Sequence, residues 1–158
     1  MNVRHLLAIA VVGSIALAGC GGAKDGKTSA GAGGATASGS KYDAGPRAAE
    51  QPVDGALAAH GEELFKTKGC SACHAFGARL SGPDLSGVAN RRTAAWMEQQ
   101  ILHPDLMTKE DPIARGLMAE YALQMPNQGL TPEEARAVVE FLKSKEHADG
   151  AAASNQTR

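Results

Sequence analysis

The stretch Cys70-Ser71-Ala72-Cys73-His74 decides how the rest of this sequence is interpreted. Two thiols three positions apart, followed directly by an imidazole, fit three kinds of site: a zinc ligand set, a redox-active thiol pair, or the attachment point of a covalent haem. A zinc site needs two further Cys or His ligands at suitable spacing, and the remaining cysteine lies far upstream. A thioredoxin-like thiol pair needs a βαβ context, which the sequence lacks because it has no alternating strand pattern. We therefore predict one covalent haem c.

In such a site Cys70 and Cys73 bond the haem, and His74 is placed against the ring to bind the iron. A low-spin electron carrier needs a sixth ligand on the opposite face of the ring. The candidates are Met97, Met107, Met118, Met125, His60, His103 and His147. Met125 precedes Pro126 and is therefore expected in extended chain, between helices. We predict Met125 as this ligand, with Met107 and then His103 as alternatives.

Apolar positions recur with a helical period across residues 53–147, the predicted folded domain. Four helices are expected there, and the second is expected to end at Pro104. The residues expected to cap them are Asp54, Thr93, Asp111 and Thr131. Gly61 lies on the apolar face of the first helix, where it costs about 0.5 to 1 kcal/mol relative to Ala unless another backbone passes close by. The predicted fold class is all-α.

The N-terminal third has a different composition. Residues 1–19 place an apolar run behind Arg4, which is typical of a secretory signal. The run ends Leu17-Ala18-Gly19-Cys20, which resembles the lipobox of bacterial lipoprotein precursors. That resemblance implies cleavage before Cys20 and a lipid anchor on it, outside the cytoplasm.

Residues 20–52 hold Gly, Ala, Ser and Thr with hardly a large apolar side chain. Such a segment cannot bury enough surface to offset its ordering entropy, so we predict a flexible linker. Residues 148–158, which are polar and rich in Ala, are predicted to be a disordered tail.

Residues 54–145 resemble a class I c-type cytochrome domain. The matching residues are Gly61 and Phe65, the Cys70–His74 stretch, Gly82-Pro83-Asp84-Leu85, Met125-Pro126, and Val138-Val139-Glu140-Phe141-Leu142-Lys143. The resemblance implies that the first and last helices cross at Gly61. It also implies that the carbonyl of Pro83 accepts the second ring N–H of His74. Arg91 and Arg92, which follow a Gly- and Pro-rich loop, are candidate partners of a haem propionate or, alternatively, part of a solvated turn.

Charge and site chemistry limit the function. With 16 Lys and Arg against 17 Asp and Glu, the chain is not built to bind nucleic acid. A haem bound by His and Met, with no titratable cluster beside it, offers no obvious place for a small-molecule substrate. We therefore predict an electron carrier and not an enzyme, lipid-anchored on the periplasmic side and moving single electrons between a respiratory donor complex and a terminal oxidase or reductase. The alternatives are a sensor or small catalytic haem domain with an open sixth position, and a dedicated subunit of a larger oxidoreductase.

Overall fold

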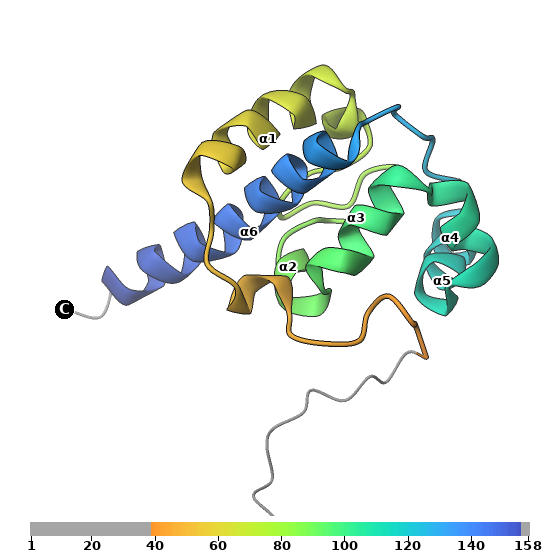
Figure 1. Cartoon of the computed structure of the whole chain (residues 1–158), viewed down its shortest axis with the longest axis horizontal. Coiled ribbons are helices and arrows are strands. Elements are labelled where there is room, and N and C mark those ends of the chain that lie inside the picture. Colours follow the sequence, from red (N-terminus) through yellow and green to blue (C-terminus); the bar gives the residue numbers. More distant parts are fainter. Residues whose placement is uncertain (1–38, 156–158) are drawn as a thin grey trace, which may run out of the picture. The chain divides into compact units, whose positions relative to one another are not determined.

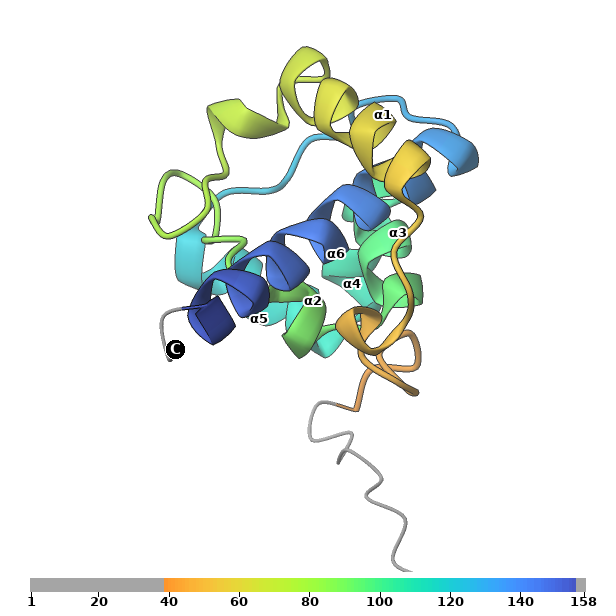
Figure 2. The ribbon, with the colours of Figure 1, turned by 90° about the vertical axis from the view of Figure 1, so that its left-hand side faces the viewer.

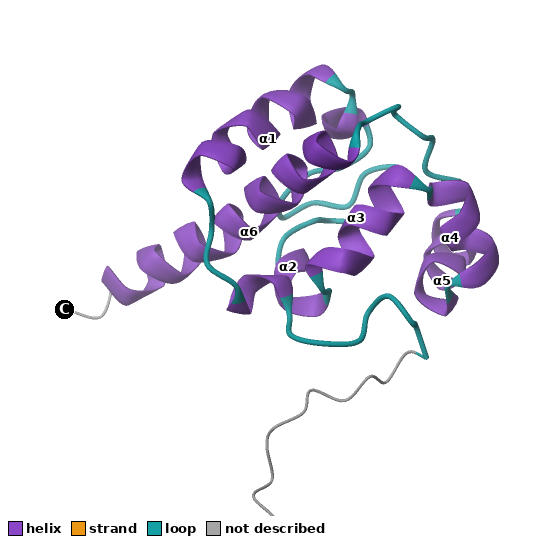
Figure 3. Ribbon diagram, viewed as in Figure 1, coloured by secondary structure: helices purple, strands orange, loops and turns teal. Residues whose placement is uncertain are grey.

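The structure is a computed structural model that describes residues 39–155, with side chains described as far as Glu146. The predicted signal segment, Cys20, the first part of the predicted linker and residues 156–158 lie outside the described residues. Every regular element in the described range is a helix, so the predicted all-α class is confirmed (Figure 3). No helix within residues 39–155 is long and apolar enough to cross a membrane.

The four predicted helices are present, and their caps are the expected residues. They are α1 (Gly55–Thr67), α3 (Ala94–Leu102), α5 (Pro112–Tyr121) and α6 (Pro132–Asn155). The Asp54 and Asp111 carboxylates and the Thr93 hydroxyl each accept backbone N–H groups of the first turn that they precede. At α6 the backbone N–H groups of Thr131 and Glu134 each donate to the other's side chain, which completes a capping box.

One helix of more than a single turn was not predicted. Pro104 ends α3 as expected, but it is also the first residue of α4 (Pro104–Glu110), because a proline fits the first helical position as well as it stops a preceding helix. The shorter elements are η1 (Ala48–Glu50), η2 (Cys70–Ala72) and α2 (Val88–Arg91). They are too short to show a helical period in the sequence.

Helices α1 and α6 lie against each other, as Figure 1 and Figure 2 both show. The contact is closest at Gly61, where a Cβ atom would lie 1.9 Å from the carbonyl oxygen of Ala137. The expectation that another backbone passes Gly61 is therefore confirmed. Beside the contact, Phe65 packs with its ring centroid 5.4 Å from that of Phe141 and 5.7 Å from that of Phe76.

The folded unit begins before the predicted boundary at residue 53. Residues 40–52, here called the strap, run along the domain and are drawn in orange in Figure 1. Ala48 is fully buried, and its N–H donates to the carbonyl of Arg92 at 2.9 Å. At the other end of the strap, the Lys143 ammonium donates to the carbonyl of Pro52 at 2.7 Å. The composition does not predict this packing because the strap is fixed by polar contacts and only three apolar residues, Tyr42, Ala48 and Ala49.

Helix α6 also differs from expectation at its C-terminal end. It continues to Asn155, into the segment that was predicted to be a disordered tail. Residues 151–153 of that segment are all alanine, the residue with the highest intrinsic helix propensity.

Candidate functional site

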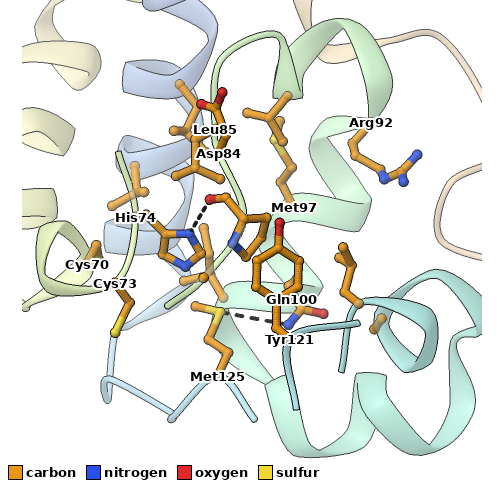
Figure 4. Close-up of a pocket in the computed structure, with 18 of the residues that line it drawn as sticks. Cys70, Cys73, His74, Asp84, Leu85, Arg92, Met97, Gln100, Tyr121 and Met125 are labelled. Carbon is orange, nitrogen blue, oxygen red and sulfur yellow. Dashed lines mark hydrogen bonds between the residues drawn. The ribbon is translucent and has the colours of Figure 1, made fainter. Parts of the chain in front are cut away.

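A cavity of about 200 Å³ collects residues from segments far apart in the sequence. Its walls come from the end of α1, the loop after η2, helices α3 and α5, the chain between α5 and α6, and α6 itself. Most of the lining is apolar, including Phe65, Leu85, Trp96, Met97, Val138 and Leu142. Cys70, Cys73, His74 and Met125 all line this cavity (Figure 4).

The two cysteines are held at the cavity edge by a single tight turn. Gly69 opens the turn with φ of 79°, a left-handed conformation that glycine adopts without strain. The carbonyl of Cys70 then accepts the N–H groups of Cys73 at 3.2 Å and His74 at 3.0 Å. Burial raises the pKa of the Cys70 thiol. A redox-active pair depends on a thiol of lowered pKa, so this environment does not favour the thioredoxin-like alternative.

His74 has one ring nitrogen engaged and the other available. Its Nδ1 lies 2.9 Å from the carbonyl oxygen of Pro83. Since a carbonyl only accepts, Nδ1 carries the proton and Nε2 keeps its lone pair for a metal ion. Gly82 makes this approach possible, because a Cβ atom there would lie 2.7 Å from Cε1 of His74.

Met125 lies in the chain between α5 and α6, outside any helix, as expected. Figure 4 shows its side chain and that of His74 pointing into the cavity. The sulfur accepts a hydrogen bond from the Gln100 side-chain amide, with Nε2 3.8 Å away. The other amide atom, Oε1 of Gln100, is buried without a partner among the described residues.

Gln100 was not predicted as part of the site. The available signal was its position on α3, where Met97, Gln100 and Ile101 follow the spacing of one helix face and all line the cavity. A polar residue on that otherwise apolar face indicates a partner in the cavity.

The other candidate ligands differ in where they lie relative to the cavity. Met97 and Met118 line the cavity from helices α3 and α5. Met107, the first alternative, is fully buried in α4 and is not among the lining residues. His60 and His103 are exposed and also lie outside the lining. The side chain of His147 lies outside the described residues. Met125 as the ligand stays a prediction.

Arg91 and Arg92 both line the cavity, but each is engaged with the protein. Arg91 donates to the carbonyls of Ser86 at 2.5 Å and Asp84 at 3.3 Å. Arg92 lies 3.5 Å from the Asp43 carboxylate and stacks over the Trp96 ring. Pairing of either arginine with a haem propionate stays a prediction.

The donor set fits a covalent haem. Two thiols stand at one edge of an apolar cavity, with a free imidazole nitrogen and a thioether sulfur turned into it. The zinc alternative has no support in residues 39–146, whose side chains are described, because no three His, Cys, Asp or Glu side chains there are grouped to hold a metal ion.

The chain is similar to known proteins. Residues 58–146 match the family model described as cytochrome c. Cytochrome c-551 of Ectopseudomonas mendocina is 34% identical over 84 residues, which are 53% of this chain and 95% of that protein. Cytochrome c-551 of Azotobacter vinelandii is 33% identical over 82 residues, or 52% of this chain and 93% of that protein. The solved cytochrome c from Rhodothermus marinus is similar with a TM-score of 0.59 and 35% identity, over 65% of this chain and 96% of that one.

Proposed function

Since the chain belongs to the cytochrome c family and carries one covalent haem c, we propose that Cys70 and Cys73 bear the haem and that His74 and Met125 bind its iron. The observation that carries the proposal is that all four side chains line one cavity, with Nδ1 of His74 held by Pro83. Haem c supplies a one-electron couple, and ligation by His and Met favours a relatively high reduction potential.

The chain's own residues prepare the site for electron transfer without substrate chemistry. The carbonyl of Pro83 fixes the orientation of His74 and raises the basicity of its free nitrogen. The apolar walls exclude water, which keeps the charge change of the iron in a medium of low dielectric constant. Gln100 donates to the thioether of Met125 and would help to hold it toward the iron. The domain is thus an electron carrier and not an enzyme.

We also propose how this domain is anchored and on which side of the membrane it acts. Residues 1–19 are the signal segment, and Cys20 carries a lipid that anchors the chain at the periplasmic face of a bacterial membrane. Because the strap belongs to the folded unit, the linker is limited to residues 20–38. As a coil this length spans about 24 Å, from 5 to 6 Å times the square root of the residue number. The carrier moves within that range between a membrane donor complex and a terminal oxidase or reductase.

Optical spectra of the purified haem protein, oxidised and reduced, test the ligand assignment. Met125→Ala should abolish the charge-transfer band between methionine sulfur and ferric iron. Met118→Ala, which also changes a cavity methionine, should keep that band. A high-spin wild-type protein would instead favour the open sixth position of a sensor or catalytic haem domain.

Fractionation of cells tests the anchor separately. Cys20→Ser should release the protein from the membrane or leave it with an uncleaved signal segment. Membrane attachment and processing identical to wild type would refute the lipid anchor.

A further inference from the structure

The strap contributes a buried carboxylate beside the haem cavity. Asp43 is 4% exposed and lies N-terminal to the segment that matches the cytochrome c family. Its Oδ1 accepts the backbone N–H of Thr93 and the guanidinium of Arg47, both at 2.9 Å. Its second oxygen, Oδ2, lies 3.5 Å from the guanidinium of Arg92. Asp43 therefore joins the strap to the residues that lead from α2 into α3.

Of the two cations beside this carboxylate, Arg47 and Arg92, Arg92 is the one that lines the cavity, and it also donates to the carbonyl of Arg91 at 3.0 Å. Figure 4 shows the guanidinium of Arg92 directed away from His74 and Met125. The guanidinium carbon lies 5.2 Å from the centroid of the Trp96 ring, which also lines the cavity. Burial lowers the pKa of Arg92, and the charge of Asp43 opposes that effect. A partly buried cation in the wall of the cavity is thus paired with the strap.

We propose that Asp43 is a positioning residue of the haem site, which holds Arg92 on the strap side of the cavity. In the native protein Arg92 then pairs with Asp43 and not, as the sequence also allowed, with a haem propionate. The inference needs only the haem in this cavity and does not depend on the lipid anchor or on the identity of the sixth ligand.

The proposal predicts the direction in which loss of the Asp43 charge changes the reduction potential. A positive charge near the iron favours the reduced state, which carries one positive charge less than the oxidised state. Loss of the Asp43 charge removes a nearby negative charge and also frees Arg92 to turn toward a propionate. Both effects raise the reduction potential, but only the second requires Arg92.

A double-mutant cycle on the holoprotein, read as reduction potential, separates these two effects. Asp43→Asn keeps an oxygen that accepts the Thr93 N–H and removes the charge. The potential should shift upward, and the upward shift should be clearly smaller when the same substitution is made together with Arg92→Gln. Asp43→Glu, which keeps the charge, should leave the potential near the wild-type value. Equal shifts with and without Arg92, or no shift at all, would overturn the proposal.

Two controls distinguish positioning from general loosening of the strap. Lys41→Gln breaks an exposed strap ion pair with Glu110, whose side chains are 65% and 43% exposed, and should not move the potential. Lys143→Met releases the other end of the strap at Pro52 and should lower the melting temperature without the upward shift. An upward shift with Lys143→Met equal to that of Asp43→Asn would also overturn the proposal.

The Asp43→Asn variant could fail to fold or fail to attach haem, and each failure can be recognised. If Asp43→Asn does not give folded holoprotein, Asp43→Ser, whose hydroxyl also accepts an N–H, is measured in the same cycle and judged by the same criteria. Failure of haem attachment would appear as missing haem absorbance, which is distinct from a haem-loaded protein whose potential does not respond.

Discussion

Asp111 shows how one buried carboxylate can connect several parts of this domain. It is 1% exposed, and its Oδ1 accepts the N–H groups of Ile113, Ala114 and the Trp96 indole, each at 3.0 Å. Its Oδ2 accepts the hydroxyl of Ser40 from the strap. Burial acts to raise the pKa of Asp111, but these hydrogen bonds together lower it below its usual value. The ionised form is therefore the one that the fold stabilises.

This lowered pKa predicts a pH-dependent contribution to stability. The contribution is present above the unfolded-state pKa of about 3.9 and is lost as the pH falls through the lower pKa of the folded state. Asp111→Asn should cost about 1 to 3 kcal/mol of unfolding free energy at pH 7. The cost should be smaller at pH 3, which is below the unfolded-state pKa, and should fall further as the pH passes through the lower pKa of the folded state. Denaturant unfolding of both holoproteins at the two pH values measures this, and a cost independent of pH would contradict the role of the ionised form.

Gln100 carries a prediction about the iron. A hydrogen bond to the Met125 sulfur draws electron density from it, which makes the thioether a poorer donor to ferric iron and favours the ferrous state. Gln100→Leu should therefore lower the reduction potential by about 20 to 40 mV, the equivalent of roughly 0.5 to 1 kcal/mol for one electron. Gln99→Leu, on the same helix but outside the cavity lining, is the matched control. An unchanged potential in the Gln100 variant would show that the hydrogen bond does not tune the iron.

At the scale of elements, the contact between α1 and α6 depends on the absence of one side chain. Gly61→Ala would place its Cβ atom 1.9 Å from a backbone oxygen of α6, so the helices must separate. We expect a loss of about 3 kcal/mol or more in unfolding free energy, from overpacking at a backbone contact. Gly116→Ala in α5, where a Cβ atom meets nothing within 4 Å, should instead stabilise by about 0.5 to 1 kcal/mol. Thermal melts of the two holoproteins measure the contrast, and equal melting temperatures would contradict the close approach.

The helices that could be predicted are those with local signals. Caps such as Asp54 and Thr93 act on backbone groups within three residues, so the sequence alone indicates where α1 and α3 begin. Helix α4 was missed because Pro104 serves as both a stop and a start, and the sequence shows the stop more clearly.

The parts that could not be predicted depend on long-range polar contacts. Ser40 and Asp43 meet residues 71 and 50 positions further along the chain, and nothing near them in the sequence indicates those partners. Gln100 reaches Met125 across the cavity in the same way. The haem-attachment stretch Cys70–His74, by contrast, could be predicted because the five residues of its pattern are consecutive in the sequence.

For the whole molecule, the extent of the folded unit is open to direct measurement. A holoprotein that starts at Gly39 keeps the strap, whereas one that starts at Val53 loses the contacts of Ser40, Asp43 and Pro52. We expect the shorter protein to be less stable by about 2 kcal/mol, or roughly 10 °C in melting temperature for a domain of this size. Equal melting temperatures of the two truncated holoproteins would show that the strap adds nothing to the fold.

The central claim is that this chain is a single-haem electron carrier whose iron is bound on both faces. A spectroscopic redox titration of the purified holoprotein, repeated under carbon monoxide, tests it most directly. The account predicts one reversible one-electron transition, low-spin spectra in both states, and no change of the reduced spectrum or of the potential with carbon monoxide. A reduced spectrum that changes promptly with carbon monoxide, together with a raised potential, would show an open iron face and contradict the account.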